Sequence, residues 1–267
     1  MSESVVGRRL PALSYFFPAH NEAANLHGLV VEALETLPAL AETFEIIIVN
    51  DGSRDETPAI ADELAVAHPE VRAVHHRTNL GYGAALRSGF AAARHDHLAF
   101  TDGDRQFKVA DLGRLIERLS RGDADAVVGY RIRRADPLVR TVYAKLYRLA
   151  NVIFFGLKVR DVDCACKLFT RASLEGVNVE SGGAFFSAEL LIKLRARGRR
   201  LAEVGVPHYP RTAGSATGAK PQVVVRAVRD FWALRFRLWA APRRALSRGT
   251  PILGNGLHAR AGDQAPG

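Results

Sequence analysis

The stretch IIIVNDGSRD, which runs from Ile46 to Asp55, decides the fold. Its first half, Ile46–Asn50, is a short β-branched run that predicts a buried strand. The second half follows at once and supplies two carboxylates, a glycine and a hydroxyl where that strand ends. The same juxtaposition recurs three times in the first half of the chain. Further strands are expected at Ser14–Phe17, Val71–His75 and Leu98–Thr101, followed by polar clusters at residues 18–22, 79–83 and 102–104.

Helical stretches separate these four strands. We expect helices over Asn25–Leu37, Pro58–Ala67 and Gly83–Ala93, with Thr57 as the N-cap of the second. Strands that alternate with helices over roughly the first 100 residues predict an α/β fold with a doubly wound, mostly parallel sheet. The ligand site of such a sheet lies beyond the carboxyl ends of its strands.

The alternation continues less regularly in the second half of the chain. We expect helices at Val109–Leu119, within Pro137–Leu157 and at Ala188–Arg197, and strands at Ala126–Gly129, Cys166–Thr170 and Leu201–Val206. A Gly/Ser/Thr-rich segment at Thr212–Gly218 then precedes a basic amphipathic helix over Pro221–Ala240, and the Gly-, Pro- and Ala-rich stretch from Ser247 to Gly267 is expected to be disordered. We therefore divide the chain into a domain of residues 1–212 and a C-terminal part of residues 213–267.

The triplet Asp102-Gly103-Asp104 places two carboxylates on one tight turn. Such a pair suits a hard divalent cation that keeps open positions for water and phosphate oxygens, and Gln106 is a candidate third oxygen ligand. Asp, Asn, Gly and Ser also dominate ordinary turns, which would explain one polar cluster but not four in order. Gly81-Tyr82-Gly83 follows the third strand and lacks the spacing of a dinucleotide-binding loop, so we reject that interpretation.

Composition bounds the possible partners and the compartment. The net charge of +9 fits nucleic acid, an anionic membrane or phosphorylated substrates, and the basic residues concentrate in the second half. Cys164 and Cys166 form neither a disulfide framework nor a zinc site. Met1–Arg9 has no apolar signal region and no run of about 18 apolar residues occurs, so we expect a cytoplasmic protein. The histidines, including His75-His76, are interpreted as surface or turn residues.

The ordered motifs resemble family 2 glycosyltransferases of the GT-A type, in particular the polyprenol-phosphate and dolichol-phosphate mannose or glucose synthases. The resemblance spans about Ser14 to Gly214. The family's Pro-x-x-Asn-Glu motif is matched by Pro18, Asn21 and Glu22, and its Asp-Gly-Ser-x-Asp motif by residues 51–55. Residues 129–131, 161–169 and 209–215 match its Gly-x-Arg element, acceptor-side segment and late Arg-x-x-Gly-Ser loop.

The resemblance implies a role for each matched residue. The nucleotide-sugar donor would be bound by Pro18, Asn21, Glu22, Asp51, Ser53 and Asp102, and Mg²⁺ or Mn²⁺ by Asp102, Asp104 and Gln106. Arg131, Lys167 and Arg133 would position a phosphate on the acceptor side. His20, Tyr82 and Cys166 differ from the residues usual in the family, and the Lys often found after the late Gly and Ser is absent. The nucleobase and the sugar of the donor therefore stay open.

The reaction implied is the inverting transfer of a hexose from GDP-mannose or UDP-glucose to a polyprenyl or dolichyl phosphate. Asp104 holds the metal, and Arg211 stabilises the departing diphosphate with it. A phosphate acceptor is already largely anionic at neutral pH, whereas a hydroxyl acceptor would need a base, for which Asp161 and Asp163 are the candidates. The alternatives are a soluble transferase acting on a small hydroxyl acceptor and a non-catalytic basic module that binds membrane or nucleic acid.

Two helices are basic and amphipathic. The first carries apolar residues at three- and four-residue intervals from Leu138 to Ile153, and the second does so from Val224 to Trp239 among arginines. Either stripe could pack against the protein, but the crowding of aromatic and Arg residues on the second favours an anionic membrane surface. We therefore expect a peripheral protein at the inner membrane surface, with no nucleic-acid partner and an undetermined oligomeric state.

Overall fold

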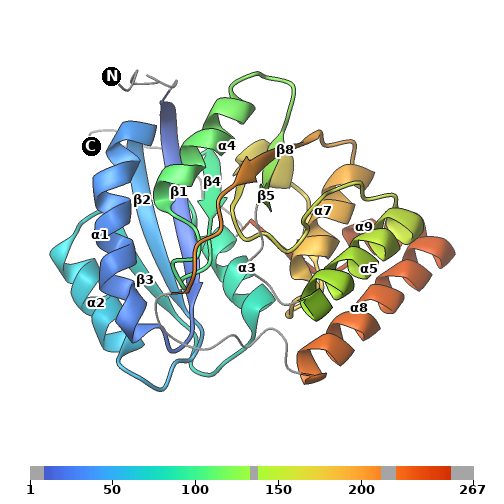
Figure 1. The fold of residues 1–267 in the computed structure, drawn as a ribbon, viewed down its shortest axis with the longest axis horizontal. Coiled ribbons are helices and arrows are strands. Elements are labelled where there is room, and N and C mark those ends of the chain that lie inside the picture. The colour runs from blue at the N-terminus through green and yellow to red at the C-terminus, as the bar shows by residue number, and fades with distance from the viewer. Residues whose placement is uncertain (1–8, 133–137, 212–220, 254–267) are drawn as a thin grey trace, which may run out of the picture.

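A computed structural model describes residues 9–132, 138–211 and 221–253. A seven-stranded sheet forms its centre, with helices on both faces (Figure 1). The strands are β1 (Leu10–Ala19), β2 (Ala41–Asn50), β3 (Val71–His75), β4 (His97–Phe100), β5 (Ala126–Arg131), β6 (Lys167–Thr170) and β8 (Leu201–Val206). Their order is β3-β2-β1-β4-β6-β5-β8. All neighbours pair in parallel except β6, which is antiparallel to both β4 and β5, so the predicted doubly wound, mostly parallel sheet is confirmed.

The strand order explains where the helices lie. The chain moves outward from β1 to β3, so α1 (Ala23–Leu40) and α2 (Thr57–Ala67) cover one face, where α4 (Leu112–Leu119) joins them after the 3₁₀ turn η1 (Val109–Asp111). It then crosses back to β4, which puts α3 (Tyr82–Ala92) on the other face, in contact with α7 (Phe186–Ala196). The reversal between β1 and β4 is the switch point at which such sheets bind ligands.

Aromatic side chains fill the core between the sheet and α3. Phe16, Phe90 and Phe100 are fully buried, and the Phe90 ring meets those of Phe16 and Phe100 edge to face, with centroids 4.8 and 5.8 Å apart. Gly89 makes room for them, since a Cβ there would stand 2.2 Å from the Phe16 ring. This packing fixes α3 against β1 and β4.

One predicted helix start is wrong in detail. Thr57 is the first residue of α2 and not its N-cap, which is Glu56 without a side-chain hydrogen bond. The Thr57 hydroxyl instead accepts from the Glu22 N–H at 2.9 Å. A local capping pattern is thus overridden by a contact between the first and second polar clusters.

The C-terminal part packs against helices of the preceding domain. α5 (Leu138–Phe155) and α8 (Pro221–Ala240) form at the predicted positions and lie side by side (Figure 1), with Phe154 and Phe155 against Phe231. After α9 (Pro242–Ser247), β9 (Thr250–Pro251) pairs antiparallel with β7 (Asn178–Val179), which the short α6 (Arg171–Leu174) precedes. Ile252 is fully buried. The prediction of disorder from Ser247 onward is therefore wrong up to Leu253, and the later residues lie outside the described ones.

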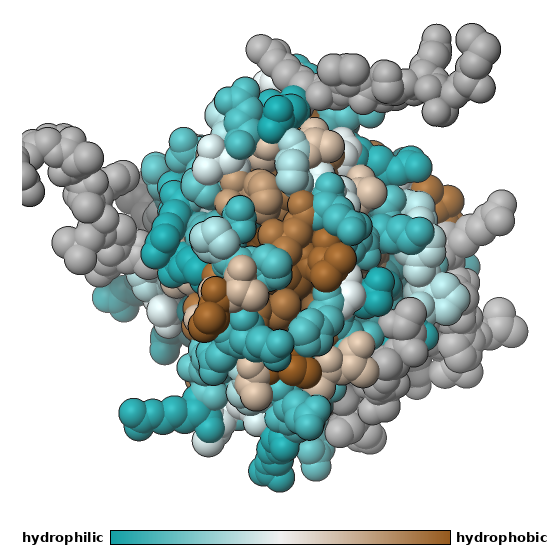
Figure 2. All heavy atoms as spheres, turned by 90° about the vertical axis from the view of Figure 1, so that its left-hand side faces the viewer, coloured by the Kyte–Doolittle hydropathy of each residue, from teal (hydrophilic) through white to brown (hydrophobic). Residues whose placement is uncertain are grey.

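The described helices differ in what they expose. None of them is both long and apolar enough to span a bilayer. Figure 2 shows apolar atoms gathered near the middle of the face of α1 and α2, whose exposed large apolar residues are Val31 and Val66. Most other exposed large apolar residues of the described chain belong to α5 and α8.

Candidate active site

The four polar clusters meet at one edge of the sheet, where the parallel strands β1 to β4 end (Figure 1). Asn21 links the first cluster to the second. Its backbone N–H donates to Ser53 Oγ at 2.9 Å, and its Oδ1 accepts from the Arg54 N–H at 2.9 Å. Asn21 has a φ of 56°, a left-handed conformation that Asn tolerates better than most residues. Asn21 and Ser53, both predicted to bind the donor, therefore also hold these loops together.

Asp51 links the second cluster to the third. Its buried carboxylate accepts from His76 Nδ1 at 2.7 Å and from the N–H groups of Leu80 and Gly81 at 2.8 and 2.9 Å. The other nitrogen of His76 lies 2.8 Å from the Ser88 hydroxyl. The interpretation of His76 as a surface or turn residue is therefore wrong. Its place directly after β3, at the same sheet edge as Asp51, was the signal in the sequence.

A glycine allows the Asp-Gly-Asp turn to approach β1. A Cβ on Gly103 would stand 2.6 Å from the carbonyl oxygen of Pro18, so a larger residue would push the turn away. Pro18, predicted to bind the nucleotide, is the last residue but one of β1 and lies beside this turn. The turn thus holds Asp102 and Asp104 where β1 and β4 end.

Asp102 carries the clearest sign of a missing partner. Its Oδ1 is buried and has no hydrogen-bond partner in the described part of the chain. Burial, and next the charge of Asp104, raise the pKa of Asp102 to about 7, while a hydrogen bond from Tyr82 opposes the shift. A cation at this oxygen would satisfy it and stabilise the ionised carboxylate. The residues present therefore fit a divalent metal.

Asp104 is buried and faces two other charged groups of the site. Its Oδ2 lies 2.5 Å from Nη2 of Arg211, whose Nη1 lies 3.6 Å from Oε1 of Glu22. Burial raises the pKa of Glu22, although a hydrogen bond from Asn25 and the charge of Arg211 act in the opposite direction. Three predicted site residues from distant segments therefore converge, with the arginine between two carboxylates.

Gln106 connects the Asp-Gly-Asp turn to the segment that ends in Arg211. Its N–H donates to Asp104 Oδ1 at 3.0 Å, and its side-chain Nε2 donates to the Tyr209 carbonyl at 3.3 Å. No three His, Cys, Asp or Glu side chains of the described ranges are close enough to ligate one ion. Asp102, Asp104 and Gln106 as the ligand set therefore stay a prediction.

Among the residues predicted to face the acceptor, Arg131 and Asp161 form a bidentate ion pair. Nε and Nη2 of Arg131 lie 2.7 and 2.9 Å from the two oxygens of Asp161. Burial alone would lower the pKa of Arg131, but its hydrogen bonds and charge interaction with Asp161 outweigh that effect and raise it. Both Asp161 oxygens are therefore bound to Arg131, and the pair lies at the end of β5.

The structure separates the two remaining acceptor-side candidates. Lys167 is fully buried, its Nζ donates to the Cys164 carbonyl, and burial lowers its pKa. Asp163 is exposed, and its charge acts on Lys167, Arg131 and Tyr82. Arg133 and the late loop after Arg211 lie outside the described residues. Of the described acceptor-side carboxylates, Asp163 is the accessible one.

Sequence reasoning missed the part that Tyr82 plays. Burial, and next the charge of Asp102, raise the pKa of Tyr82, which places its phenol beside the Asp-Gly-Asp turn. The glycines on either side serve packing, since Gly83 N–H donates to the Gly182 carbonyl at 3.1 Å and a Cβ on Gly83 would stand 2.8 Å from the Gly182 carbonyl carbon. This donation also occupies an N–H that an anion at the start of α3 could have used. The departure of Tyr82 from the family pattern was the available signal.

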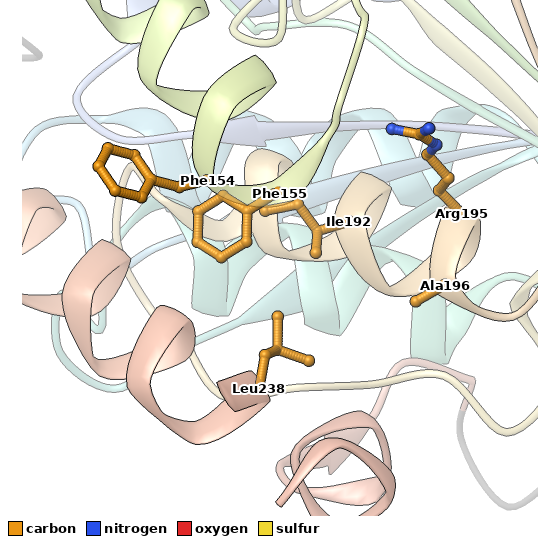
Figure 3. A pocket seen from close by; sticks show the side chains of 6 residues that line it. All are labelled: Phe154, Phe155, Ile192, Arg195, Ala196 and Leu238. Atoms are coloured by element: carbon orange, nitrogen blue, oxygen red, sulfur yellow. The ribbon is translucent and has the colours of Figure 1, made fainter. Parts of the chain in front are cut away.

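An apolar hollow of about 300 Å³ lies away from these residues, between α5, α7 and α8. Figure 3 shows Phe155, Ile192 and Leu238 pointing toward one space from three helices, with the Arg195 guanidinium turned away from it. The hollow is therefore separate from the strand-end site.

Comparison with known proteins gives one match to a family. Residues 14–177 match the family described as Glycosyl transferase family 2. Glycosyltransferase AglD of Haloferax volcanii is 36% identical over 207 residues, which cover 74% of this chain and 33% of that protein. Dolichyl-phosphate beta-glucosyltransferase ALG5D of Trichomonas vaginalis is 30% identical, covering 73% of this chain and 64% of that protein. The chain thus spans a third of the first relative and slightly less than two thirds of the second.

Two further similarities concern a shorter relative and the fold. Polyprenol monophosphomannose synthase of Mycolicibacterium smegmatis is 29% identical, covering 83% of this chain and 86% of that protein. Glucosyl-3-phosphoglycerate synthase of Mycobacterium tuberculosis superimposes with a TM-score of 0.64 at 18% identity, covering 84% of this chain and 79% of that one. Another crystal structure of that enzyme contains Mn²⁺, uridine diphosphate and glucosyl-3-phosphoglycerate and gives a TM-score of 0.62 at 17% identity. At these identities, the structural similarity shows the GT-A fold alone.

Proposed function

The chain belongs to glycosyl transferase family 2, and from this we propose that it transfers a hexose from a nucleotide-diphosphate sugar, with inversion, to a polyprenyl or dolichyl phosphate. The observation that carries the proposal is the convergence of Asp102, Asp104, Glu22 and Arg211 at the strand ends, with Asp102 Oδ1 buried and unpartnered among the described residues. The relatives named for transfer to a lipid phosphate support this acceptor class.

On the donor side, Asp102, Asp104 and Gln106 would hold Mg²⁺ or Mn²⁺. When bound, the ion would neutralise charge that develops on the leaving diphosphate. Arg211 already lies against Asp104, so its guanidinium is close enough to contact the same diphosphate with paired N–H donors. Pro18, Asn21, Glu22, Asp51 and Ser53 surround the place proposed for the nucleotide.

On the acceptor side, a phosphate needs positioning more than deprotonation, because its second pKa is about 6. Arg131 is the described cation proposed to contact it, with Asp161 as the group that orients the guanidinium. Because Lys167 is buried, it would act on the acceptor phosphate through its charge and not by direct contact.

A small hydroxyl acceptor is the second candidate. The observation that favours it is the exposure of Asp163, whose charge acts on Tyr82 and Lys167 and which could accept the hydroxyl proton. Asp161 is the weaker candidate for a base, because Arg131 engages both of its oxygens. The two reactions give products that partition differently between water and organic solvent.

We also propose that α8 rests on an anionic membrane surface on the cytoplasmic side. Val225, Phe236 and Trp239 are 69%, 60% and 76% exposed, whereas Phe231 and Leu234 are buried against the protein. Packing therefore accounts for one side of this helix and leaves its aromatic, arginine-rich remainder in solvent, which favours an interfacial position. On α5, the side chains up to residue 144 lie outside the described ones.

A donor screen tests the proposed reaction. Purified protein, polyprenyl phosphate and either Mg²⁺ or Mn²⁺ are incubated with labelled sugar nucleotides, and label is counted after organic extraction. Label in the organic phase with at least one donor is expected. Label transferred only to water-soluble hydroxyl acceptors supports the second candidate, and the absence of turnover with any donor contradicts both.

A further inference from the structure

A second hollow, of about 210 Å³, lies between α8 and the segment that follows β7. We refer to it as the α8 hollow. It is lined by Glu180, Ser181, Gly182, Glu189, Arg226, Arg229, Asp230, Ala233, Leu234 and Arg237. Charged residues dominate this lining, in contrast to the apolar hollow of Figure 3.

Two of its three carboxylates, Glu189 and Asp230, accept hydrogen bonds from the segment that follows β7. Glu189 accepts from the N–H groups of Glu180 and Ser181 at 2.9 and 2.8 Å, and Lys193 lies 2.8 Å from it. Asp230 accepts from the Ser181 hydroxyl at 3.1 Å. These acids therefore serve to attach α8 and α7 to the segment between them.

Only one of the two carboxylate oxygens of Glu180 has partners among the described residues. Its Oε2 receives both Arg237, at 2.6 Å, and Arg248, at 3.2 Å. Its Oε1 is buried and has no hydrogen-bond partner within the described ranges. A buried acceptor of this kind is costly unless a donor reaches it, so the hollow lacks one donor.

Two arginines of the hollow remain available. Arg226 has no acidic partner among the described residues, and a Cβ built on Gly182 would stand 3.3 Å from its Nη2. Arg229 is 75% exposed, and the carboxylate nearest to it, Asp230, is 3.8 Å away. Because the two are three residues apart on α8, they share one face of that helix. Two guanidinium groups on one face of a helix suit the oxygens of a phosphate.

Exposed apolar side chains flank these arginines. Val225 precedes Arg229 by one helical turn and Trp232 follows it by nearly one, and both are exposed. Arg226 and Arg229 thus stand at the border of the apolar part of α8. A soluble anion would gain nothing from such a border, whereas a lipid would place its phosphate on the arginines and its chains along the apolar side.

We propose that the α8 hollow binds the headgroup of an anionic phospholipid. The phosphate lies on Arg226 and Arg229, and a headgroup hydroxyl, as in phosphatidylglycerol, donates to Glu180 Oε1. The site is distinct from the acceptor site and rests on the proposed membrane position of α8. Its role is to fix how deep and at what angle the helix meets the membrane.

The test measures sedimentation of the full chain with vesicles of phosphatidylcholine containing phosphatidylglycerol, without any sugar donor. Arg226→Gln, Arg226→Lys and the matched control Arg235→Gln are compared with the wild type. Arg235 lies on the same helix but does not line the hollow. Loss of one charge near a membrane lowers binding roughly fivefold, which is the expected effect of the control. Arg226→Gln should lower it severalfold more, and Arg226→Lys should weaken binding although the charge is kept.

Wild-type binding by Arg226→Lys would overturn the proposal, as would an Arg226→Gln variant no weaker than Arg235→Gln. A third arm adds inorganic phosphate at the concentration of the lipid phosphate. Release of the protein from the vesicles would show a soluble-anion site and overturn the lipid assignment, while retention supports it. Because no sugar transfer is measured, these results stand whether or not the proposed reaction is found.

Discussion

Arg211 stands where the proposed reaction needs a positive charge. Its guanidinium bridges Asp104 and Glu22, two carboxylates that come from the ends of different strands. In this position it offsets the repulsion between them when no ion is bound. We expect the same group to turn toward the diphosphate once a divalent cation occupies the Asp-Gly-Asp turn.

Asp104→Ala should abolish both metal binding and transfer. One remaining carboxylate cannot hold the ion against a diphosphate, so we expect turnover to fall by about 100-fold or more. Mn²⁺ binding followed by electron paramagnetic resonance, in the presence of nucleoside diphosphate, gives a readout that does not depend on the acceptor. Asp123→Ala, at an exposed position away from the site, is the matched control. Unchanged metal-dependent turnover of the Asp104 variant would remove the Asp-Gly-Asp turn from the mechanism.

The sequence predicted which residues belong to the site better than what each one contacts. Asp102, Asp104, Gln106 and Arg211 were named from motifs, and the structure brings them together. The bonds of Asp51 to His76 and Gly81 were not predictable, because their partners are 25 and 30 residues away and no local pattern links them. The pairing of Arg131 with Asp161 and the burial of Lys167 were not predicted for the same reason.

Glu45 is a carboxylate on which the attachment of β2 to its neighbours depends. Burial would raise its pKa, but hydrogen bonds from Ser14, Arg72 and the Arg94 N–H outweigh burial and lower it. A carboxyl group whose pKa is lower in the folded than in the unfolded protein stabilises the fold at pH values above its pKa in the unfolded state. This stabilisation is lost as the pH falls through its pKa in the folded state.

Glu45→Gln should therefore destabilise the protein by about 1 to 3 kcal/mol at neutral pH. The difference in the free energy of unfolding from the wild type should shrink as the pH falls below about 4.3, the usual pKa of a glutamate. Urea unfolding at several pH values measures this, with the exposed Glu175→Gln as the control. If the difference in the free energy of unfolding between the wild type and Glu45→Gln stays constant with pH, the charge of Glu45 is not its cause.

The packing of α3 depends on a glycine at its start. A Cβ on Gly83 would stand 2.8 Å from both the Gly182 backbone and Phe186 Cβ, so the helix would have to shift. Tyr82, beside the Asp-Gly-Asp turn, would shift with it. Gly113 in α4 is the matched control, because a Cβ there would meet only a Leu40 methyl at 3.4 Å.

Gly83→Ala should lower stability by about 1 to 3 kcal/mol and reduce turnover. Gly113→Ala should leave turnover unchanged and raise stability by roughly 0.4 to 1 kcal/mol, because alanine restricts the unfolded chain where the native backbone accepts it. Thermal unfolding and initial rates measure both variants. Equal behaviour of the two would mean that α3 does not need close contact with residues 182–186.

The predictability of the elements follows from their length. β1 to β4 carry β-branched and aromatic runs, so they were placed correctly, although β1 and β2 were predicted too short and β4 was shifted by one residue. β7 and β9 have two residues each and show no period, and only their pairing with one another identifies them. The sequence of Ser247–Leu253 looks disordered because its stability comes from burial of Ile252 and from Lys193, which donates to the Arg248 carbonyl.

At the scale of the whole molecule, α8 both belongs to the core and faces outward. Phe231 and Leu234 are buried, and the chain after α8 returns to pair with β7. Deleting residues 221–267 would therefore disturb the fold as well as any membrane contact. The division at residue 212 stays a prediction, and point substitutions on the exposed side test the membrane position more cleanly.

Phe236→Ser combined with Trp239→Ser should weaken binding to anionic vesicles by roughly tenfold, because both apolar side chains are removed from the interface. Both are mostly exposed, so the melting temperature should hardly change. Val66→Ser, at a still more exposed position on α2, is the control and should bind as the wild type does. Wild-type sedimentation of the double variant would place the membrane contact elsewhere.

The proposed reaction moves a hexose with inversion from a nucleotide-diphosphate sugar onto a lipid phosphate. Nuclear magnetic resonance of the organic-extracted product tests it most directly, because it reports both the atom that carries the sugar and the anomeric configuration. From an α-linked donor, the predicted product is a β-linked glycosyl phosphodiester of the lipid, formed by the wild type and not by Asp104→Ala. An α-linked product, or sugar attached to a hydroxyl oxygen instead of the phosphate, would contradict the account.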